Sequence, residues 1–187
     1  MLSEKHAEKH AAKVQAALAK QLKALTKDGV IPDVIPDNLN FKPAYELGVK
    51  FPSGKKAALG KELPATACLS APTVTWPADP EAFYTVMMID PDAPCREKPT
   101  QGEYRHWVVA NIPGDDVNKG EDLTLYEEPQ PPQGTGLHRY VFLLYKQKGQ
   151  LELSVFEGKR ASWNAQRWAK SKGMTLEGCA YFQCQEK

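Results

Sequence analysis

Three sequence motifs contain most of the residues that could bind a ligand or catalyse a reaction. Residues 90–94 (DPDAP) follow a strongly apolar stretch, while residues 103–107 (EYRHW) and 131–140 (PPQGTGLHRY) each lead into another. Together the motifs supply two aspartates, two histidines and two tyrosines. If the three apolar stretches form neighbouring strands, these six side chains meet at one edge of a sheet. The motifs therefore predict a polar pocket at the strand ends.

The first motif places two carboxylates on a rigid turn. Asp90 directly follows an apolar stretch that is typical of a strand buried on both faces. Pro91 and Pro94 lack a backbone N–H and have a fixed φ, so they end the sheet ladder and turn the chain. An aspartate in such a turn can also cap it through its own side chain. We assign that structural role to Asp92 and the functional role to Asp90.

The other two motifs each place a histidine at the start of an apolar strand, His106 in one and His138 in the other. The loop 131–136 joins two prolines to two glycines, and such a loop can present backbone N–H groups to an anion. Tyr104 and Tyr140 add aromatic rings with hydroxyl groups. Because histidine and tyrosine donate hydrogen bonds, we expect the pocket to bind a small phosphate-like group.

Two other chemistries use the same residue types. Aspartate and histidine are metal ligands, but His106 and His138 lie far apart in the sequence, and we expect no metal site. Hydrolysis needs a nucleophile beside a histidine, and the candidate is Cys95, whose thiolate would be favoured by Arg96. A hydrolase that uses Cys95 or a pocket histidine stays an alternative. Our prediction is a protein with no catalytic residue and no cofactor.

The composition is ordinary for a globular domain and excludes several classes. The chain has 187 residues, of which 42% are apolar and 25% charged, and its net charge is +1. No overall field therefore attracts nucleic acid or an anionic membrane, and any phosphate must be bound locally. No apolar run is long enough for a transmembrane helix, and early charges interrupt a signal peptide. From these two observations we expect a cytoplasmic location, and there the four cysteines, which form no Cys-x-x-Cys, would be reduced thiols.

The sequence predicts a helix over residues 3–27. Val14, Leu18, Leu22 and Leu25 recur at helical spacing and form a narrow apolar stripe on an otherwise lysine-rich segment. We interpret this segment as a helix packed on the domain, with a membrane-surface or partner-binding helix as the alternative. The sequence thus divides into an N-terminal helical extension (1–28) and one domain (29–187).

The rest of the chain is mostly β. Frequent prolines exclude long helices between residues 29 and 64. A late helix is predicted from Ser162, as its N-cap, to about Lys172. The predicted strands comprise residues 47–51, 73–76, 83–89, 107–112, 139–145 and 181–184.

Taken together, the three motifs closely resemble the phosphatidylethanolamine-binding protein family, which includes the Raf kinase inhibitor proteins and the plant flowering regulators. The resemblance lies in DPDAP-x-R (90–96), E-Y-x-H-W (103–107) and PP-x-GTGLHRY (131–140), and residues 29–35 look like the family's opening segment. It covers about residues 29–185. The combination of GTGLHRY with DPDAP at this distance is highly specific.

This resemblance implies a mainly β fold, with a central antiparallel β-sheet, a second small sheet and a few peripheral helices. It also implies an anion pocket at the strand ends, which takes the phosphate of a phospholipid head group such as phosphatidylethanolamine. Transferred position by position, the ligand-binding residues are Asp90, Ala93, Tyr104, His106, Pro131, Pro132, His138 and Tyr140.

The resemblance also implies a role for the side chains of the pocket. Asp90 would orient a histidine or a hydroxyl donor, His106 and His138 would face the phosphate, and Tyr104 and Tyr140 would line the wall. Members of the family typically regulate kinases, proteases or transcription complexes and are not enzymes. We therefore expect a monomeric regulator with a protein kinase or serine protease as partner and no nucleic acid.

The sequence departs from the family pattern at the pocket. Glu128 and Gln130 stand where two glycines are usual, and Glu127 and Glu128 add negative charge near an anion site. Cys95 replaces a frequent serine, and Tyr104 a frequent tryptophan. A weakened pocket would leave the second alternative, a scaffold whose pocket is vestigial and which binds partners through its loops and N-terminal helix.

Overall fold

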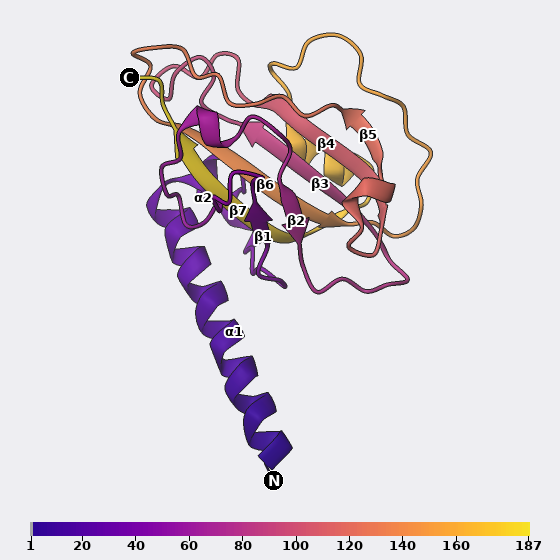
Figure 1. Cartoon of the computed structure of the whole chain (residues 1–187). Coiled ribbons are helices and arrows are strands. Elements are labelled where there is room, and N and C mark those ends of the chain that lie inside the picture. The colour runs from indigo at the N-terminus through magenta and orange to yellow at the C-terminus, as the bar shows by residue number, and fades with distance from the viewer. Residues whose placement is uncertain (1) are drawn as a thin grey trace.

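A five-stranded antiparallel sheet forms the centre of the protein, as the computed structural model shows (Figure 1). The structure describes residues 2–187, with side chains from Glu4 onward. The strand order is β5-β4-β3-β6-β7, and every neighbouring pair is antiparallel. The strands are β3 (Phe83–Asp90), β4 (Tyr104–Pro113), β5 (Glu121–Thr124), β6 (His138–Lys146) and β7 (Thr175–Cys184).

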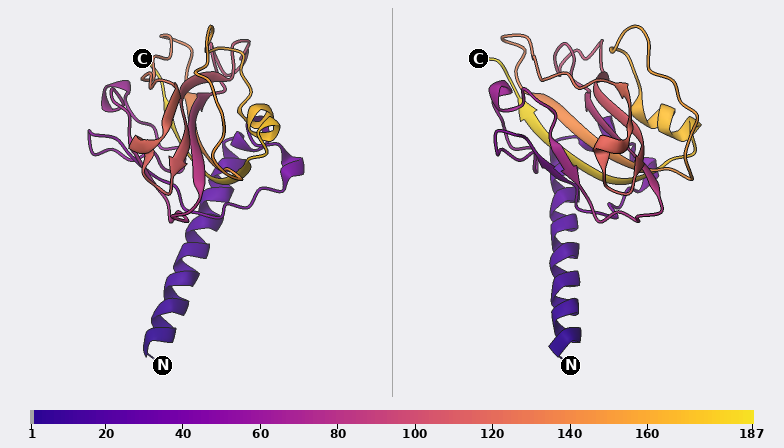
Figure 2. Two further views of the ribbon diagram at one scale, coloured as in Figure 1. Left: turned by 90° about the vertical axis from the view of Figure 1, so that its right-hand side faces the viewer. Right: turned by 45° about the vertical axis from the view of Figure 1, so that its right-hand side comes forward.

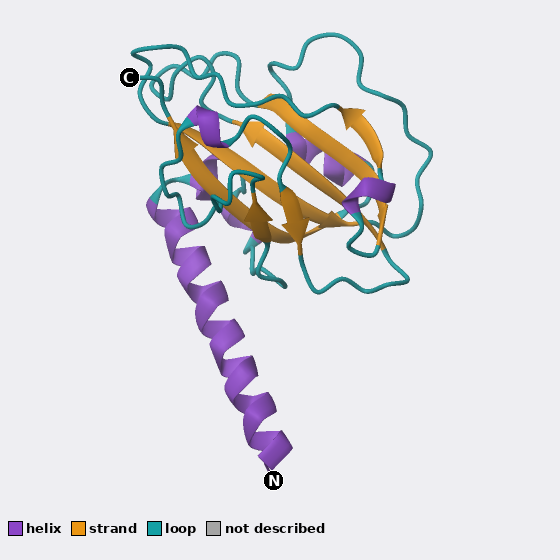
Figure 3. Cartoon of the chain, in the orientation of Figure 1, coloured by secondary structure: helices purple, strands orange, loops and turns teal. Residues whose placement is uncertain are grey.

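A second sheet of two strands, β1 (Gly48–Lys50) and β2 (Thr73–Thr75), packs on one face of the large sheet (Figure 3). The predicted mainly β fold with a small second sheet is therefore confirmed. Strand β5 was not predicted, because Glu121 and Asp122 interrupt any alternation of apolar residues. Strand β7 begins six residues before the predicted start at residue 181.

The central strands are apolar throughout because both faces of the large sheet are covered. Alternate side chains of β3 enter two separate cores: Val86 and Met88 pack towards the small sheet, while Met87 and Ile89 pack on the opposite face. The second core is closed by α2 (Val30–Asp33), α3 (Ala165–Ser171) and the end of the N-terminal helix. Single-turn 3-10 helices occur at Asp37–Leu39, Ala65–Ala67 and Val117–Lys119.

Helix α3 begins later than the sequence predicted. Its N-cap is Asn164, whose side-chain oxygen accepts a hydrogen bond from the backbone N–H of Arg167 at 2.7 Å. The predicted cap, Ser162, lies outside the helix, and its N–H donates to the carbonyl of Gln101. Glu103 also accepts from the N–H of Ala165 at 2.6 Å, and burial raises the pKa of Glu103 to about 7.

Helix α1 (Leu2–Lys27) projects from the domain as a straight rod, and only its C-terminal part is docked (Figures 1 and 2). Leu18, Gln21 and Leu25 are buried, and the side-chain amide of Gln21 donates to the carbonyl of Cys179. The side chains of residues 4–13 are exposed. No helix in the described part of the chain is long and apolar enough to cross a membrane. The division of the chain at residue 28 stays a prediction.

Candidate functional site

A cavity of about 230 Å³ opens where strands β3, β4 and β6 meet their loops. Strand pairing brings these ends together, because Asp90 at the end of β3 pairs with Tyr104 at the start of β4 and β6 begins at His138 on the other side of β3. The structure brings all eight sequence-predicted residues to this cavity. Its lining comprises Asp90, Ala93, Pro94, Gln101, Tyr104, His106, Glu127, Gln130, Pro131, Pro132, His138 and Tyr140.

Asp90 orients one of the two histidines. Its carboxylate accepts a hydrogen bond from Nδ1 of His138 at 2.8 Å, and both side chains are almost completely buried. The other carboxylate oxygen of Asp90 accepts from the N–H of Asp92 at 2.7 Å. Because both oxygens are engaged, the carboxylate holds the imidazole ring and the turn after β3 in one arrangement.

The second nitrogen of this imidazole is also occupied. Nε2 of His138 lies 2.8 Å from the hydroxyl oxygen of Thr135, which in turn lies 2.7 Å from the carbonyl oxygen of Pro132. Thr135 stands between Gly134 and Gly136, both with positive φ and with open space where a Cβ would be. A ligand that bonds to Nε2 of His138 must therefore displace the Thr135 hydroxyl or bond to it.

His106 differs from His138 in its hydrogen bonds. Its Nδ1 donates to the carbonyl oxygen of Glu127 at 2.8 Å, so the neutral ring carries its proton there and leaves Nε2 as an acceptor. Burial lowers the pKa of His106, and this effect outweighs the backbone carbonyl of Glu127 and the charge of Asp90, which raise it. At neutral pH this histidine is a neutral wall residue with an open Nε2.

The carboxylate of Glu127, which the sequence analysis placed near the anion site, lies in the pocket lining, but its two partners were not predicted. Tyr104 donates its hydroxyl to one oxygen at 2.9 Å, and Nε of Arg160 lies 3.1 Å from the other. Burial and then the bond to Glu127 raise the pKa of Tyr104. Arg160 also donates to the carbonyl of Leu125 at 2.9 Å, which fixes the loop that follows β5. The negative charge of Glu127 is thus balanced within the protein.

Tyr140 forms the apolar base between the two histidines. Its ring centroid is 5.2 Å from that of His106 in an edge contact and 6.4 Å from that of His138 in a stacked one. Behind it, the ring of Phe182 stacks at 5.2 Å. Burial raises the pKa of Tyr140 far above its usual value, so the phenol stays neutral.

The second aspartate of the DPDAP motif has a different role from the one predicted. Asp92 does not cap the turn; Asp90 accepts that bond. The carboxylate of Asp92 instead holds the guanidinium of Arg139 in two bonds, at 2.9 Å from Nε and 2.7 Å from Nη2. No sequence pattern predicts this pair, because it joins residues 47 positions apart that meet only in the folded sheet.

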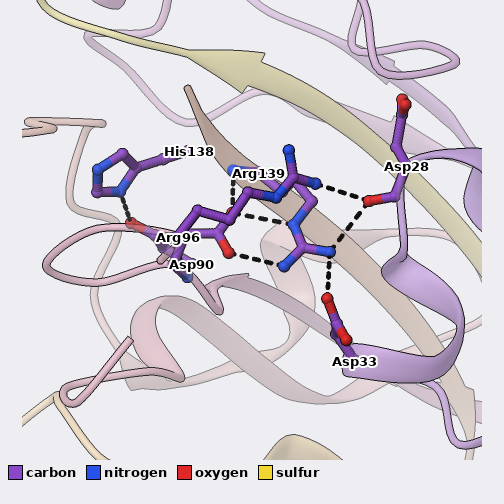
Figure 4. A network of polar contacts seen from close by, with 7 residues as sticks. Asp28, Asp33, Asp90, Arg96, His138 and Arg139 are labelled. Atoms are coloured by element: carbon purple, nitrogen blue, oxygen red, sulfur yellow. Dashed lines mark hydrogen bonds and ion pairs between the residues drawn. The ribbon is translucent and has the colours of Figure 1, made fainter. Parts of the chain in front are cut away.

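The Asp92–Arg139 pair continues into a network behind the pocket (Figure 4). Nη1 of Arg139 contacts the carboxylate of Asp33 at 2.7 Å and the backbone carbonyl of Asp28 at 3.1 Å. Arg96 donates to the same carbonyl at 2.7 Å. Burial alone would lower the pKa of Arg139, but its two carboxylate partners outweigh burial and raise it. The network ties the turn after β3 to the end of α1.

The two alternative chemistries depend on metal-ligating side chains and on Cys95. Within the described part of the chain, no group of three or more His, Cys, Asp or Glu side chains is placed to hold a metal ion. Cys95 is half-buried, follows the cavity residue Pro94 and is not itself part of the lining. All four cysteines are free thiols.

An antiparallel sheet with a small second sheet and a polar pocket at its strand ends defines a distinct class of β proteins. The sequence profile of the phosphatidylethanolamine-binding proteins matches residues 43–182. The chain therefore belongs to the phosphatidylethanolamine-binding protein family. Membership supports a binding or regulatory role, and it leaves the ligand and the partner open.

Similar proteins come from several kingdoms. Protein BROTHER of FT and TFL 1 of Arabidopsis thaliana is 34% identical over 173 residues, which cover 91% of this chain and 95% of that protein. Putative odorant-binding protein A5 of Drosophila melanogaster is 41% identical over 120 residues, but the match covers 64% of this chain and only 57% of that protein.

Solved structures agree over most of the chain. A carboxypeptidase Y inhibitor, crystallised with its cognate proteinase, has a TM-score of 0.81 at 26% identity, covering 93% of this chain and 97% of the inhibitor. The phosphatidylethanolamine-binding protein of Plasmodium vivax has a TM-score of 0.79 at 28% identity, covering 89% of this chain and 98% of that one. The central sheet and its helices therefore follow the family fold.

Proposed function

We propose that the protein binds phosphate-bearing head groups of the phosphatidylethanolamine type in the cavity at the strand ends and thereby regulates a protein partner. The observation that carries this proposal is the convergence of His106, His138, Tyr104 and Tyr140 on one cavity. A volume of about 230 Å³ suits a head group rather than a whole lipid, since pockets for drug-sized ligands begin at about 300 Å³.

A protein kinase or a serine protease is the proposed partner. The likeness to a carboxypeptidase Y inhibitor supports a protease, because that protein was crystallised with its proteinase. A cytoplasmic location is part of the same proposal and is supported by the free thiols of all four cysteines, which a reducing compartment preserves.

Imidazole NMR tests the pocket directly. We expect glycerophosphoethanolamine, added to the full-length protein, to shift the ring nitrogen signals of His106 and His138, since both rings line the cavity. His10 on the exposed part of α1 is an internal control and should not move. Unchanged signals of both pocket histidines at millimolar ligand would contradict the proposal. Equal shifts at His10 would show non-specific binding.

A regulatory scaffold with a vestigial pocket is the second candidate, and one observation favours it. Polar groups of the cavity already have partners within the protein. Thr135 contacts His138, and Tyr104 and Arg160 contact the carboxylate of Glu127. If the pocket is vestigial, saturating glycerophosphoethanolamine will leave inhibition of a protease unchanged. If head-group binding regulates the partner, the inhibition constant will change with ligand concentration.

A further inference from the structure

Helix α1 carries a straight row of lysines along one side. At about 3.6 residues per turn, the six side chains fall within an arc of roughly 80° around the helix axis. With a rise of about 1.5 Å per residue, the row is about 33 Å long. All six side chains are exposed. The lysine row comprises Lys5, Lys9, Lys13, Lys20, Lys23 and Lys27.

The lysine row faces away from the domain. Leu18 and Leu25, which dock the helix, lie on the opposite side of α1, and the rod projects into solvent beyond them (Figure 2). Glu4 and Glu8 fall outside the arc of the row by the same periodicity. In the part of the chain whose contacts are described, no carboxylate forms an ion pair with any of the six lysines.

We propose that the lysine row binds the surface of an anionic lipid bilayer. A planar surface of negative charge can contact all six ammonium groups at once, because they lie on one narrow side of a straight helix. The row supplies this charge locally, in a protein whose net charge is only +1. No apolar side chain needs to enter the bilayer, so the contact is electrostatic and reversible.

Two other anionic partners fit the helix less well. A nucleic acid site usually adds arginine, phenylalanine, tyrosine or tryptophan side chains that reach bases, and α1 contains none of these four. An acidic partner helix would bury the apolar seam of α1, which runs through Ala7, Ala11 and Val14 on the side away from the lysines. The lysine row is also separate from the cavity at the strand ends, and the proposal does not rest on head-group binding there.

Vesicle co-sedimentation of the full-length protein tests the proposal. We expect binding to vesicles of phosphatidylcholine mixed with phosphatidylserine at low salt, and no binding to phosphatidylcholine alone or at high salt. The triple variant Lys5→Gln, Lys9→Gln, Lys13→Gln should lower the partition coefficient about a hundredfold, at roughly fivefold per lysine. These residues lie in the exposed part of α1, so the fold should be unchanged.

A matched triple variant distinguishes a specific effect of the lysine row from a general effect of net charge. Lys42→Gln, Lys55→Gln, Lys61→Gln removes the same three charges from exposed positions of the domain and should keep nearly all binding. Equal losses in the two triple variants would overturn the proposal, because net charge would then explain the affinity. Wild-type protein that stays in the supernatant with anionic vesicles but binds a DNA duplex or an acidic peptide would overturn it as well.

Discussion

The two pocket histidines are prepared for different tasks by their hydrogen bonds. His138 is held on both sides, by Asp90 at Nδ1 and by Thr135 at Nε2. His106 is held only at Nδ1, by the carbonyl of Glu127, and its Nε2 faces the cavity. A bound anion therefore meets one ring that is fixed and one that can gain a proton. The second ring gives the site a built-in dependence on pH.

Anion affinity should rise as pH falls, and His106 is the cause. The pKa of His106 lies below its usual value in the free protein, so the ring is neutral at pH 7. A nearby anion favours the charged ring and raises this pKa, so binding takes up a proton. We expect the affinity for glycerophosphoethanolamine, whose own charge is constant here, to increase up to about tenfold per pH unit below pH 7. Calorimetric titrations at several pH values measure it.

A variant at position 106 tests whether His106 causes the pH dependence of anion affinity. His106→Asn keeps a side-chain N–H at the position of Nδ1, which can reach the carbonyl of Glu127 but cannot take up a proton. Its affinity should vary little with pH over the same range. A pH dependence as steep in this variant as in the wild type would show that another group takes up the proton.

Among the elements, the tie between the turn after β3 and the start of β6 holds the pocket together from behind. Asp92 and Arg139 are both buried, and each lies two or fewer residues from a pocket side chain. Arg139 reaches further, to Asp33 at the end of α2 and to the carbonyl of Asp28 just after α1. The same guanidinium thus joins the pocket to the N-terminal helix.

The two carboxylates on Arg139 should differ strongly in their effect on stability. Asp92→Asn leaves a buried guanidinium without its main partner and should lower the free energy of unfolding by about 3–5 kcal/mol. Asp33→Asn removes a partner that is 53% exposed and should cost less than about 1 kcal/mol. Urea unfolding curves of both variants measure this difference. Similar losses would mean that water satisfies Arg139 equally well at either position.

The sequence predicted the strands that form the pocket because their burial on both faces makes them almost wholly apolar. It also placed Asp90, Tyr104, His106, His138 and Tyr140 together, since neighbouring strand ends meet in an antiparallel sheet. The other three predicted lining residues, Ala93, Pro131 and Pro132, came from the family resemblance. It did not predict Glu127 and Arg160 as partners, because their contact depends on how two loops lie beside β4. That Asp90 also accepts the turn bond, while Asp92 binds Arg139, was equally hidden, since both residues occupy the same short turn.

At the scale of the whole molecule, the C-terminal part of α1 packs on the domain, and its N-terminal part projects from it. Leu18 and Leu25 are buried against the domain, and the hydroxyl of Tyr181 lies 2.9 Å from the carbonyl oxygen of Ala24. Residues 4–13 are exposed along their whole length. The sequence-based division at residue 28 treats the helix as one extension, whereas these contacts favour a functional boundary near residue 14.

Two truncations distinguish these boundaries. Removing residues 1–13 should leave the melting temperature nearly unchanged, because the side chains of residues 4–13 are all exposed. Removing residues 1–27 should destabilise the domain by more than about 4 kcal/mol, since each buried leucine contributes roughly 2–5 kcal/mol. Thermal unfolding compares the two. If the longer truncation melts like the full chain, α1 is an independent arm, and the lysine row then belongs to a helix that can change its angle to the domain. If it unfolds, the row is held rigidly, and the domain must follow any surface that the helix contacts.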